Sequence, residues 1–166
     1  MEILAVIDQK DYDPNLTYFR RKAARGIIFK DGKLLMIKSD MYGEYKFPGG
    51  GILKYEPPID GLKRELLEET GMRIIYSTIK EFGKTLELRQ SQHGQRIFRQ
   101  ESYYYTCQID TTKPVVATVQ PTYEQDYGHL PVFTTVEQAI AANEKCLDLP
   151  HLSWMPRELA VLKKLL

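Results

Sequence analysis

The stretch from Phe47 to Met72, FPGGGILKYEPPIDGLKRELLEETGM, constrains the fold most strongly because a glycine-rich turn precedes a short helix with clear ends. Pro57 and Pro58 suit the start of a helix, where the fixed φ of proline fits and its missing N–H costs nothing. Gly71 suits the left-handed residue that often ends a helix. The sequence therefore predicts a helix over about 59–70. Its apolar residues recur at helical spacing and predict one buried face: Ile59, Leu62 and Leu66.

Three glutamates of this helix, Glu65, Glu68 and Glu69, project side by side because they are spaced i, i+3 and i+4. Like charges at this spacing destabilise a helix by roughly a few tenths of a kcal/mol per pair. The helix dipole disfavours anions in the last turn by a further 0.3–1 kcal/mol, roughly. A solvated acidic face is the simpler interpretation. A hard divalent cation such as Mg²⁺ would offset the repulsion and keep positions for water and phosphate oxygens.

The spacing of the whole stretch resembles the Nudix box without a mismatch. The motif reads Gly50, five residues, Glu56, seven residues, Arg64-Glu65-Leu66, one residue, Glu68-Glu69, one residue, Gly71-Met72. On this resemblance the chain is identified as a member of the MutT-like Nudix hydrolase family. The resemblance implies an α/β fold, an α/β/α sandwich with a mixed β-sheet between helices. It also implies metal-dependent hydrolysis of a diphosphate bond in a nucleoside diphosphate linked to a group X.

The resemblance assigns roles to residues of the box. The implied metal ligands are Glu65, Glu68, Glu69 and the carbonyl of Gly49. The implied catalytic residues are Glu65, which would activate water, Arg64, which would orient the carboxylates, Glu56, which would support the site from the loop, and Glu69. The expected cofactor is Mg²⁺, with Mn²⁺ as the alternative.

Three further residues are candidates for substrate binding. Arg25 belongs to a run of four cations, and arginine forks match phosphate oxygens, although a solvated face is the simpler interpretation. Tyr55 stands where members of the family commonly have glycine. Glu124 lies in a segment, 110–130, rich in Thr, Pro and Gly, and the family often takes an additional acid from this part of the chain. Asp126 is the alternative to Glu124.

Apolar runs elsewhere predict a sheet and two further helices. The predicted elements are a hairpin over 23–39 that turns at Asp31-Gly32, a second hairpin of strands 73–88 and 95–109, a short strand at 132–133, a helix that starts near 136 and is capped by Thr134 or Thr135, and a helix over 156–166. Residues 1–14 begin with an apolar run. They predict either an edge strand or an arm onto a second subunit.

Length and charge limit the alternatives. The 166 residues predict one domain, 1–166, in which 1–16 would form an N-terminal extension or edge strand. A net charge of +1 gives no bulk attraction to a nucleic acid polymer or a membrane, so a small nucleotide is the expected partner, and a homodimer is left open. No segment resembles a signal peptide or a membrane span, and Cys107 and Cys146 form no CxxC motif. We therefore expect a cytoplasmic protein with reduced thiols.

Three functions remain open at this stage. A nucleoside triphosphate pyrophosphatase is favoured because the chain has little beyond the core fold. The second reading is a hydrolase of ADP-ribose, a nucleotide sugar or a dinucleotide. Such enzymes of the family often use an extra N-terminal strand region and a dimer, which residues 1–14 could supply. The third is a nucleotide-sensing module without turnover, against which the intact set of glutamates argues.

Overall fold

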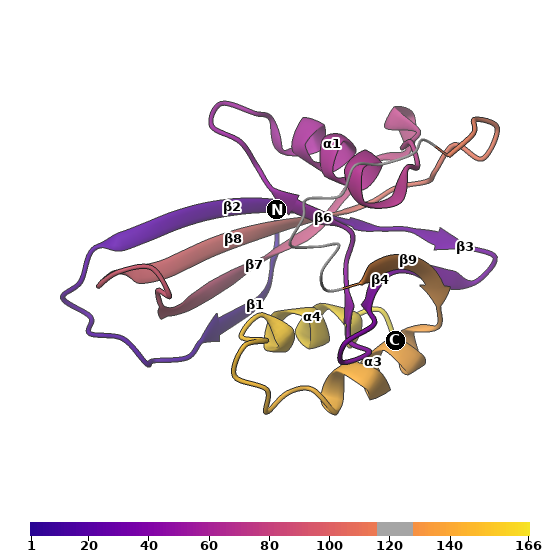
Figure 1. Ribbon diagram of the computed structural model, residues 1–166. Helices are drawn as coiled ribbons and strands as arrows, with labels where there is room; N and C mark the ends of the chain where they lie inside the picture. Colours follow the sequence, from indigo (N-terminus) through magenta and orange to yellow (C-terminus); the bar gives the residue numbers. More distant parts are fainter. Residues whose placement is uncertain (116–127) are drawn as a thin grey trace.

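The computed structural model of the chain describes residues 1–115 and 128–166 (Figure 1). Its large sheet has the strand order β1-β7-β8-β2-β6. The strands are β1 Ile3–Asp8, β2 Tyr18–Ile27, β6 Gly49–Gly51, β7 Lys80–Gln90 and β8 Ile97–Thr106. β1 pairs with β7 and β2 with β8 in parallel, whereas β7 and β8, and β2 and β6, are antiparallel. The sheet is therefore mixed, as predicted.

A second, smaller sheet begins where the chain leaves β2 of the large sheet. Its strands are β3 Phe29–Lys30, β4 Lys33–Ser39, β5 Tyr45–Lys46 and β9 His129–Thr134. β4 pairs with the other three, all antiparallel. The hairpin predicted over 23–39 is confirmed, and its turn residues Asp31 and Gly32 have φ values of 51° and 74°, as a tight primed turn requires. β2 begins earlier than predicted because its whole length pairs with β8.

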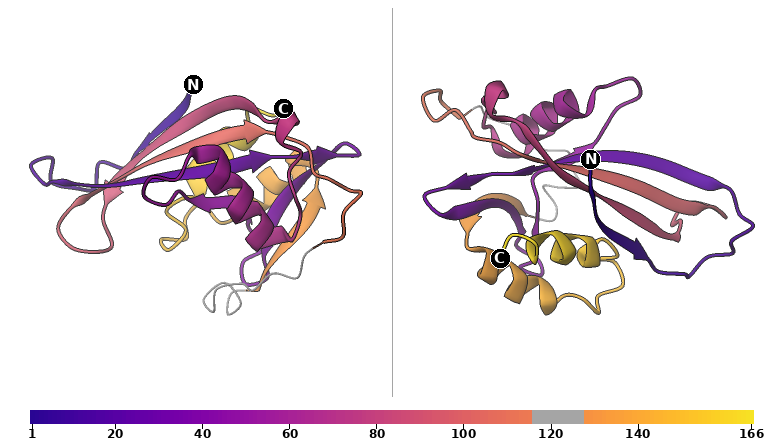
Figure 2. Two further views of the ribbon diagram at one scale, coloured as in Figure 1. Left: turned by 90° about the horizontal axis from the view of Figure 1, so that it is seen from above. Right: turned by 180° about the vertical axis from the view of Figure 1, so that it is seen from behind.

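Three helices cover the sheets: α1 Pro58–Thr70, α3 Val136–Glu144 and α4 Met155–Leu162. α1 lies on one side of the large sheet, and α3 and α4 lie on the other (Figures 1 and 2). Leu62 of α1 packs with Ala24 and Tyr105 of the sheet, while residues of α4 pack with Phe47 and Tyr104. The predicted α/β fold with a mixed sheet between helices is confirmed.

The helix ends follow from local sequence. α1 begins one residue before the predicted start and ends at Gly71, whose φ of 70° is left-handed and whose N–H donates to the carbonyl of Leu67. α3 is capped by Thr135, which forms a capping box with Gln138. α4 ends at Leu162, four residues before the predicted end.

The prediction of a continuous strand over 73–88 is wrong in its first half. Ile74 forms an isolated bridge, residues 76–78 form a 3-10 helix, and β7 starts only at Lys80. Thr78 explains the difference, because its hydroxyl donates to the carbonyl of Ile75 and accepts the N–H of Gln108. Such local side-chain bonds compete with the pairing of a strand.

The N-terminal run forms β1, so the edge-strand interpretation is the one that the structure shows. Leu4 packs against the core that Phe47 and Tyr104 share with α4. Cys107 and Cys146 are both buried free thiols, as expected. No helix among the described residues has the length and apolar character needed to cross a membrane.

Candidate active site

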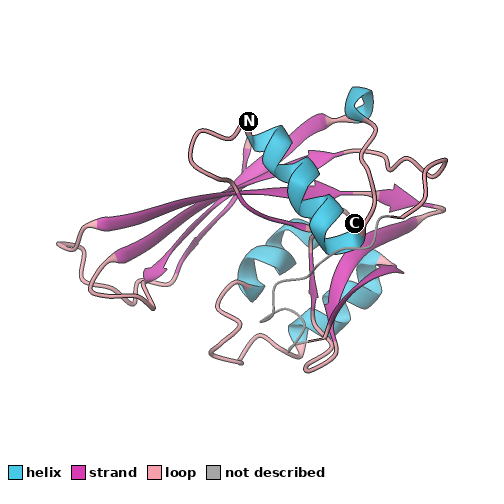
Figure 3. Cartoon of the chain, turned by 45° about the horizontal axis from the view of Figure 1, so that its top comes forward, coloured by secondary structure: helices cyan, strands magenta, loops and turns pink. Residues whose placement is uncertain are grey.

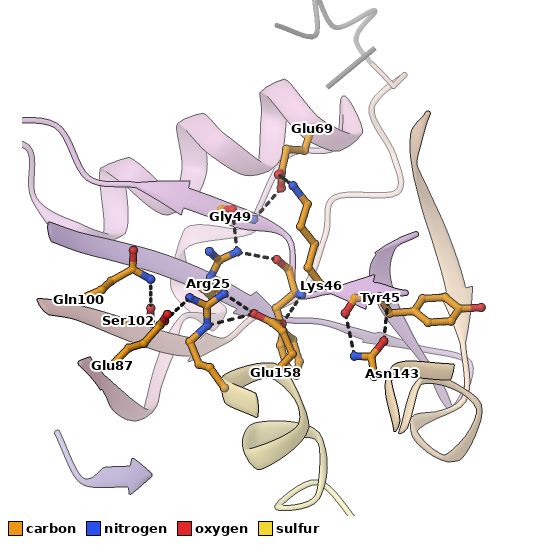
Figure 4. A network of polar contacts seen from close by, with 12 residues as sticks. Arg25, Tyr45, Lys46, Gly49, Glu69, Glu87, Gln100, Ser102, Asn143 and Glu158 are labelled. Atoms are coloured by element: carbon orange, nitrogen blue, oxygen red, sulfur yellow. Dashed lines mark hydrogen bonds and ion pairs between the residues drawn. The ribbon is translucent and has the colours of Figure 1, made fainter. Parts of the chain in front are cut away.

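The chain segment from Phe47 to Gly49 is held by charged side chains from three separate elements (Figure 4). The N–H of Phe47 donates to Oε2 of Glu158 on α4 at 2.8 Å. Nη1 of Arg25 on β2 donates to the carbonyls of Phe47 and Gly49, both at 3.1 Å. The N–H of Gly49 donates to Oε2 of Glu69 on α1 at 2.7 Å. We call Glu158, Arg25 and Glu69 the loop clamp.

Gly49 must be glycine for the backbone to adopt its conformation, whereas Gly50 leaves room for the side chain of Glu65. Gly49 has a φ of 128°, and a Cβ there would lie 2.1 Å from the carbonyl oxygen of Ala24. A Cβ on Gly50 would lie 2.4 Å from Oε2 of Glu65. The glycines therefore let the carboxylate of the helix lie directly against the backbone of the strand.

Arg64 joins the helix to the loop before it. Its Nε and Nη2 donate to Glu56 at 2.9 Å each, its Nη1 donates to Oε1 of Glu65 at 2.7 Å, and its Nη2 also donates to the carbonyl of Gly51 at 2.9 Å. The hydrogen bonds from Arg64, followed by the N–H of Leu53, lower the pKa of Glu56 to about 2. Glu56 is therefore an anion at neutral pH and fixes the position of Arg64.

The three glutamates predicted to bind metal have different surroundings. Glu65 and Glu69 line a cleft of about 580 Å³. Glu69 is buried, and its Oε1 lies 3.3 Å from Nζ of Lys46. Glu68 is 50% exposed and lies 3.5 Å from Nη1 of Arg64. The structure therefore brings two of the three to the cleft, while Glu68 lies at the surface beside it.

The donor set fits a hard cation chemically. Carboxylate oxygens of Glu65, Glu68 and Glu69 and the carbonyl of Gly49 are the ligand types that Mg²⁺ prefers. Within residues 1–115 and 128–166, however, no three acidic, histidine or cysteine side chains converge as a ready coordination group. Magnesium therefore remains a prediction for this chain.

Basic side chains share the cleft with the two glutamates. Arg21 and Lys46 line it near β6, and Arg89 lines it farther along the large sheet. Trp154 and His151, which precede α4, also line the cleft. Trp154 also packs against the core, and neither residue has a sequence motif that would place it at the cleft.

A buried charge network reaches the wall of the cleft, because Arg157 and Glu87 both line it. Arg157 on α4 donates from Nη1 to Glu87 on β7 at 3.0 Å, and from Nε and Nη2 to Glu158 at 3.1 and 2.7 Å. The exposed fractions of these three side chains are 4%, 1% and 0%. Sequence reasoning missed the network. A signal was present, because Glu158 is spaced three residues after Met155 and four before Leu162 and so falls on the buried face of the helix.

The candidates outside the box have different positions. Arg25 lines the cleft, but its Nη1 donates to the backbone carbonyls of Phe47 and Gly49 and so holds the loop. Tyr55 is 91% exposed and is not part of the cleft lining. Its φ of 68° is left-handed, which explains why glycine is common at this position. Glu124 and Asp126 lie outside the described residues, so their role stays a prediction.

The fold and the cleft define a general class, an α/β protein that presents carboxylates and basic side chains together, as phosphate-handling enzymes do. Residues 19–158 match the profile of the NUDIX domain, and the chain therefore belongs to the NUDIX domain family. The predicted family is confirmed. The match does not test the predicted single domain over 1–166.

Two similar proteins support the assignment. A solved structure of a NUDIX hydrolase from Nitrosomonas europaea superposes with a TM-score of 0.55 at 16% identity, over 86% of this chain and 90% of that one, which shows a shared fold. An RNA pyrophosphohydrolase from Bartonella bacilliformis is 46% identical over 54 residues, 30% of this chain. The chain spans about a third of the length of that relative, 31%. Together with the family match, these similarities support the predicted hydrolase class.

Proposed function

We propose that this chain hydrolyses a phosphoanhydride bond in a nucleoside diphosphate linked to a group X, with a nucleoside triphosphate as the leading substrate. The observation that supports the proposal is that Glu65 and Glu69 open on the same cleft as Arg21 and Lys46. The carboxylates can position water and a cation, and the basic side chains can compensate the charge of the phosphates. A nucleoside triphosphate and water would yield the monophosphate and pyrophosphate.

Each residue of the box has a distinct role in this proposal. Glu65 accepts the proton of the attacking water, and Arg64 orients it through the 2.7 Å bond to Oε1. Glu56 fixes Arg64 from the loop. Glu69 holds the N–H of Gly49 and so sets the position of the loop at the cleft. A divalent cation, Mg²⁺ or Mn²⁺, held by Glu65, Glu68, Glu69 and the carbonyl of Gly49, would neutralise phosphate charge and acidify the attacking water.

The 5′-triphosphate end of an RNA is the second candidate substrate. The observation that favours it is the partial similarity to a protein named RNA pyrophosphohydrolase. The reading as an ADP-ribose or dinucleotide hydrolase depended partly on an extra N-terminal strand region and a dimer. β1 is such a strand and pairs with β7 of its own chain, so this reading remains the alternative.

The test is phosphate release, with and without a coupling phosphatase, in Mg²⁺ and in Mn²⁺. The substrates are nucleoside triphosphates, oxidised nucleotides, ADP-ribose, nucleotide sugars, dinucleoside polyphosphates and a 5′-triphosphorylated RNA. Glu69→Gln keeps the shape and the hydrogen-bond acceptor but removes the charge, and should lower turnover by about 10²-fold or more. Asp60→Asn is the matched control, because Asp60 lies on the same helix, is 54% exposed and pairs with Lys63.

The two variants separate the outcomes. Loss in Glu69→Gln with retention in Asp60→Asn would support the proposal. Equal activity of Glu69→Gln and the unaltered protein would exclude the assigned site. No turnover of any substrate by a folded protein would favour the sensing module without catalysis.

A further inference from the structure

Two phenylalanines lie side by side on the large sheet, and the guanidinium of an arginine lies over each of their rings. The guanidinium carbon of Arg89 lies 3.9 Å from the ring centroid of Phe98. The ring centroids of Phe98 and Phe19 are 6.2 Å apart. The guanidinium carbon of Arg96 lies 4.9 Å from the ring centroid of Phe19. We call these four residues the arginine–phenylalanine row.

The row starts inside the cleft and leads out of it. Phe98 on β8 is paired with Phe19 on β2 and with Arg89 on β7, so the row crosses three adjacent strands. Arg89 and Phe98 line the cleft, whereas Arg96 is exposed and is not part of the lining. The outer ends of these long strands project beyond the helices (Figure 3). The outer part of the row is therefore accessible from solvent.

The row is too far from the glutamates to meet the reacting phosphates. Gly51 of the glycine run is paired with Ala23 on β2, and Phe19 lies four residues before Ala23 on the same strand. At about 3.3 Å per residue, the row lies roughly 13 Å along β2 from the level of Gly51. A substrate that reacts beside β6 would thus present bases, not phosphoanhydrides, to the row.

We propose that the arginine–phenylalanine row is a stacking subsite for a single-stranded oligonucleotide whose 5′ polyphosphate lies at the glutamates. This proposal rests on the proposed function, because it takes the cleft as the place where the 5′ phosphates are bound. It extends the substrate from one nucleotide to a short chain that leaves the cleft past the buried Phe98 and stacks on the exposed Arg96 and the half-buried Phe19.

The chemistry of the row suits this ligand. Bases stack on aromatic rings and on guanidinium planes without regard to sequence, and arginine also attracts the phosphates between them. Arg96 forms no ion pair with another described residue, so its charge is available to a phosphate. The net charge of +1 predicted no affinity for a nucleic acid polymer, but a net charge averages over the surface and does not describe a local row of arginines.

The test compares ATP with 5′-triphosphorylated di-, tri- and tetranucleotides that begin with adenosine, in ribose and deoxyribose forms. The measured quantity is the ratio of kcat/KM for each oligonucleotide to kcat/KM for ATP. Arg96→Gln removes one stacked guanidinium from an exposed position and so leaves the core intact. Arg20→Gln is the matched control, because Arg20 stacks on Tyr18 at a similar distance, 5.0 Å, on the opposite face of the same strand.

We expect a ratio of about 5- to 100-fold in the unaltered protein, the range for stacking one base. Arg96→Gln should reduce this ratio toward one, while Arg20→Gln should leave it unchanged. A ratio near one in the unaltered protein, or an equal loss in both variants, would overturn the proposal.

A binding measurement separates this inference from the proposed function. Fluorescence anisotropy of a labelled 5′-monophosphorylated tetranucleotide reports the subsite without turnover. Suppose that no substrate is hydrolysed, but the tetranucleotide binds and Arg96→Gln lowers its affinity more than Arg20→Gln does. In that case the subsite is supported and the hydrolase assignment fails. If hydrolysis of ATP is found but the tetranucleotide binds no better than AMP, the subsite fails and the hydrolase assignment stands.

Discussion

Replacing Gly50 with alanine tests whether the position of the Glu65 carboxylate controls turnover. A Cβ at this position would lie 2.4 Å from Oε2 and 2.5 Å from Cδ of Glu65, whereas ordinary contact begins at 3.4 Å. The carboxylate must therefore move by about 1 Å and weaken its 2.7 Å bond to Arg64. A misplacement of about 1 Å can cost roughly 10²-fold in rate, or about 2.7 kcal/mol of activation free energy.

The same change should have little effect on the free energy of unfolding. The pair of Glu65 and Arg64 is partly exposed, so its loss costs about 0–1 kcal/mol. Alanine in place of glycine reduces the conformational freedom of the unfolded chain and so stabilises the folded state by about 0.4–1 kcal/mol. This holds at Gly50 because its φ is not left-handed. We therefore expect the melting temperature to stay within about 2–4 °C of the original value.

A double-mutant cycle decides the mechanism of the loss. Gly50→Ala, Glu65→Ala and the double variant are compared by kcat on the best substrate of the panel, with thermal unfolding measured in parallel. If the alanine acts by displacing the carboxylate, it should have no further effect once Glu65 is absent. Full turnover in Gly50→Ala, or the same fractional loss in both backgrounds, would refute the reasoning.

Three further predictions concern stability and pH. Glu158→Gln removes the charge of the buried partner of Arg157 and should lower the free energy of unfolding by about 3–5 kcal/mol. Calorimetry should then show a melting temperature about 6–20 °C lower. A fall of less than about 2 °C would contradict this prediction. The pKa of Glu56 is lowered from 4.5 to about 2, so its contribution to stability is present at neutral pH and is lost as the pH falls from 4.5 to 2. The difference in urea midpoint between the unaltered protein and Glu56→Gln should therefore become smaller as the pH falls over that range. Arg64→Gln should raise the pKa of Glu56, measured by NMR, toward 4.5. An unchanged pKa would show that Arg64 does not lower it. Leu62→Ala should cost about 2–5 kcal/mol in denaturant unfolding because the side chain is fully buried, and a loss under about 1 kcal/mol would argue against the packing of α1.

The part of the site predicted from the sequence is the part that local chemistry determines. The ends of α1 follow from Pro58 and Gly71, and the adjacency of the glutamates follows from helical spacing. The bond from Arg64 to Glu56 was not explicit in the sequence. It fits the predicted role of Arg64, because only Pro57 separates Glu56 from the start of α1, on which Arg64 lies.

The part that sequence reasoning missed depends on pairing between distant segments. Alternation of side chains predicts a strand and its faces but does not identify its partner. The parallel pairing of β1 with β7 was therefore not predictable, nor was the bond between Glu158 and Phe47, which are 111 residues apart. The substrate was equally beyond reach, because the cleft walls come from strand ends and from the connection before α4.

The loop clamp makes ligand binding at the glycine run visible in the melting of the entire protein. β2, α1 and α4 each hold one part of the Phe47–Gly49 backbone, so the binding geometry exists only when all three elements are in place. A ligand that binds this geometry and not the unfolded chain stabilises the fold by about 2.7 kcal/mol at a hundred times its Kd. That corresponds to a rise of about 5–11 °C in melting temperature for a chain of this size. Ligands of this site, including products and compounds that are not turned over, could therefore be found in a thermal-shift screen.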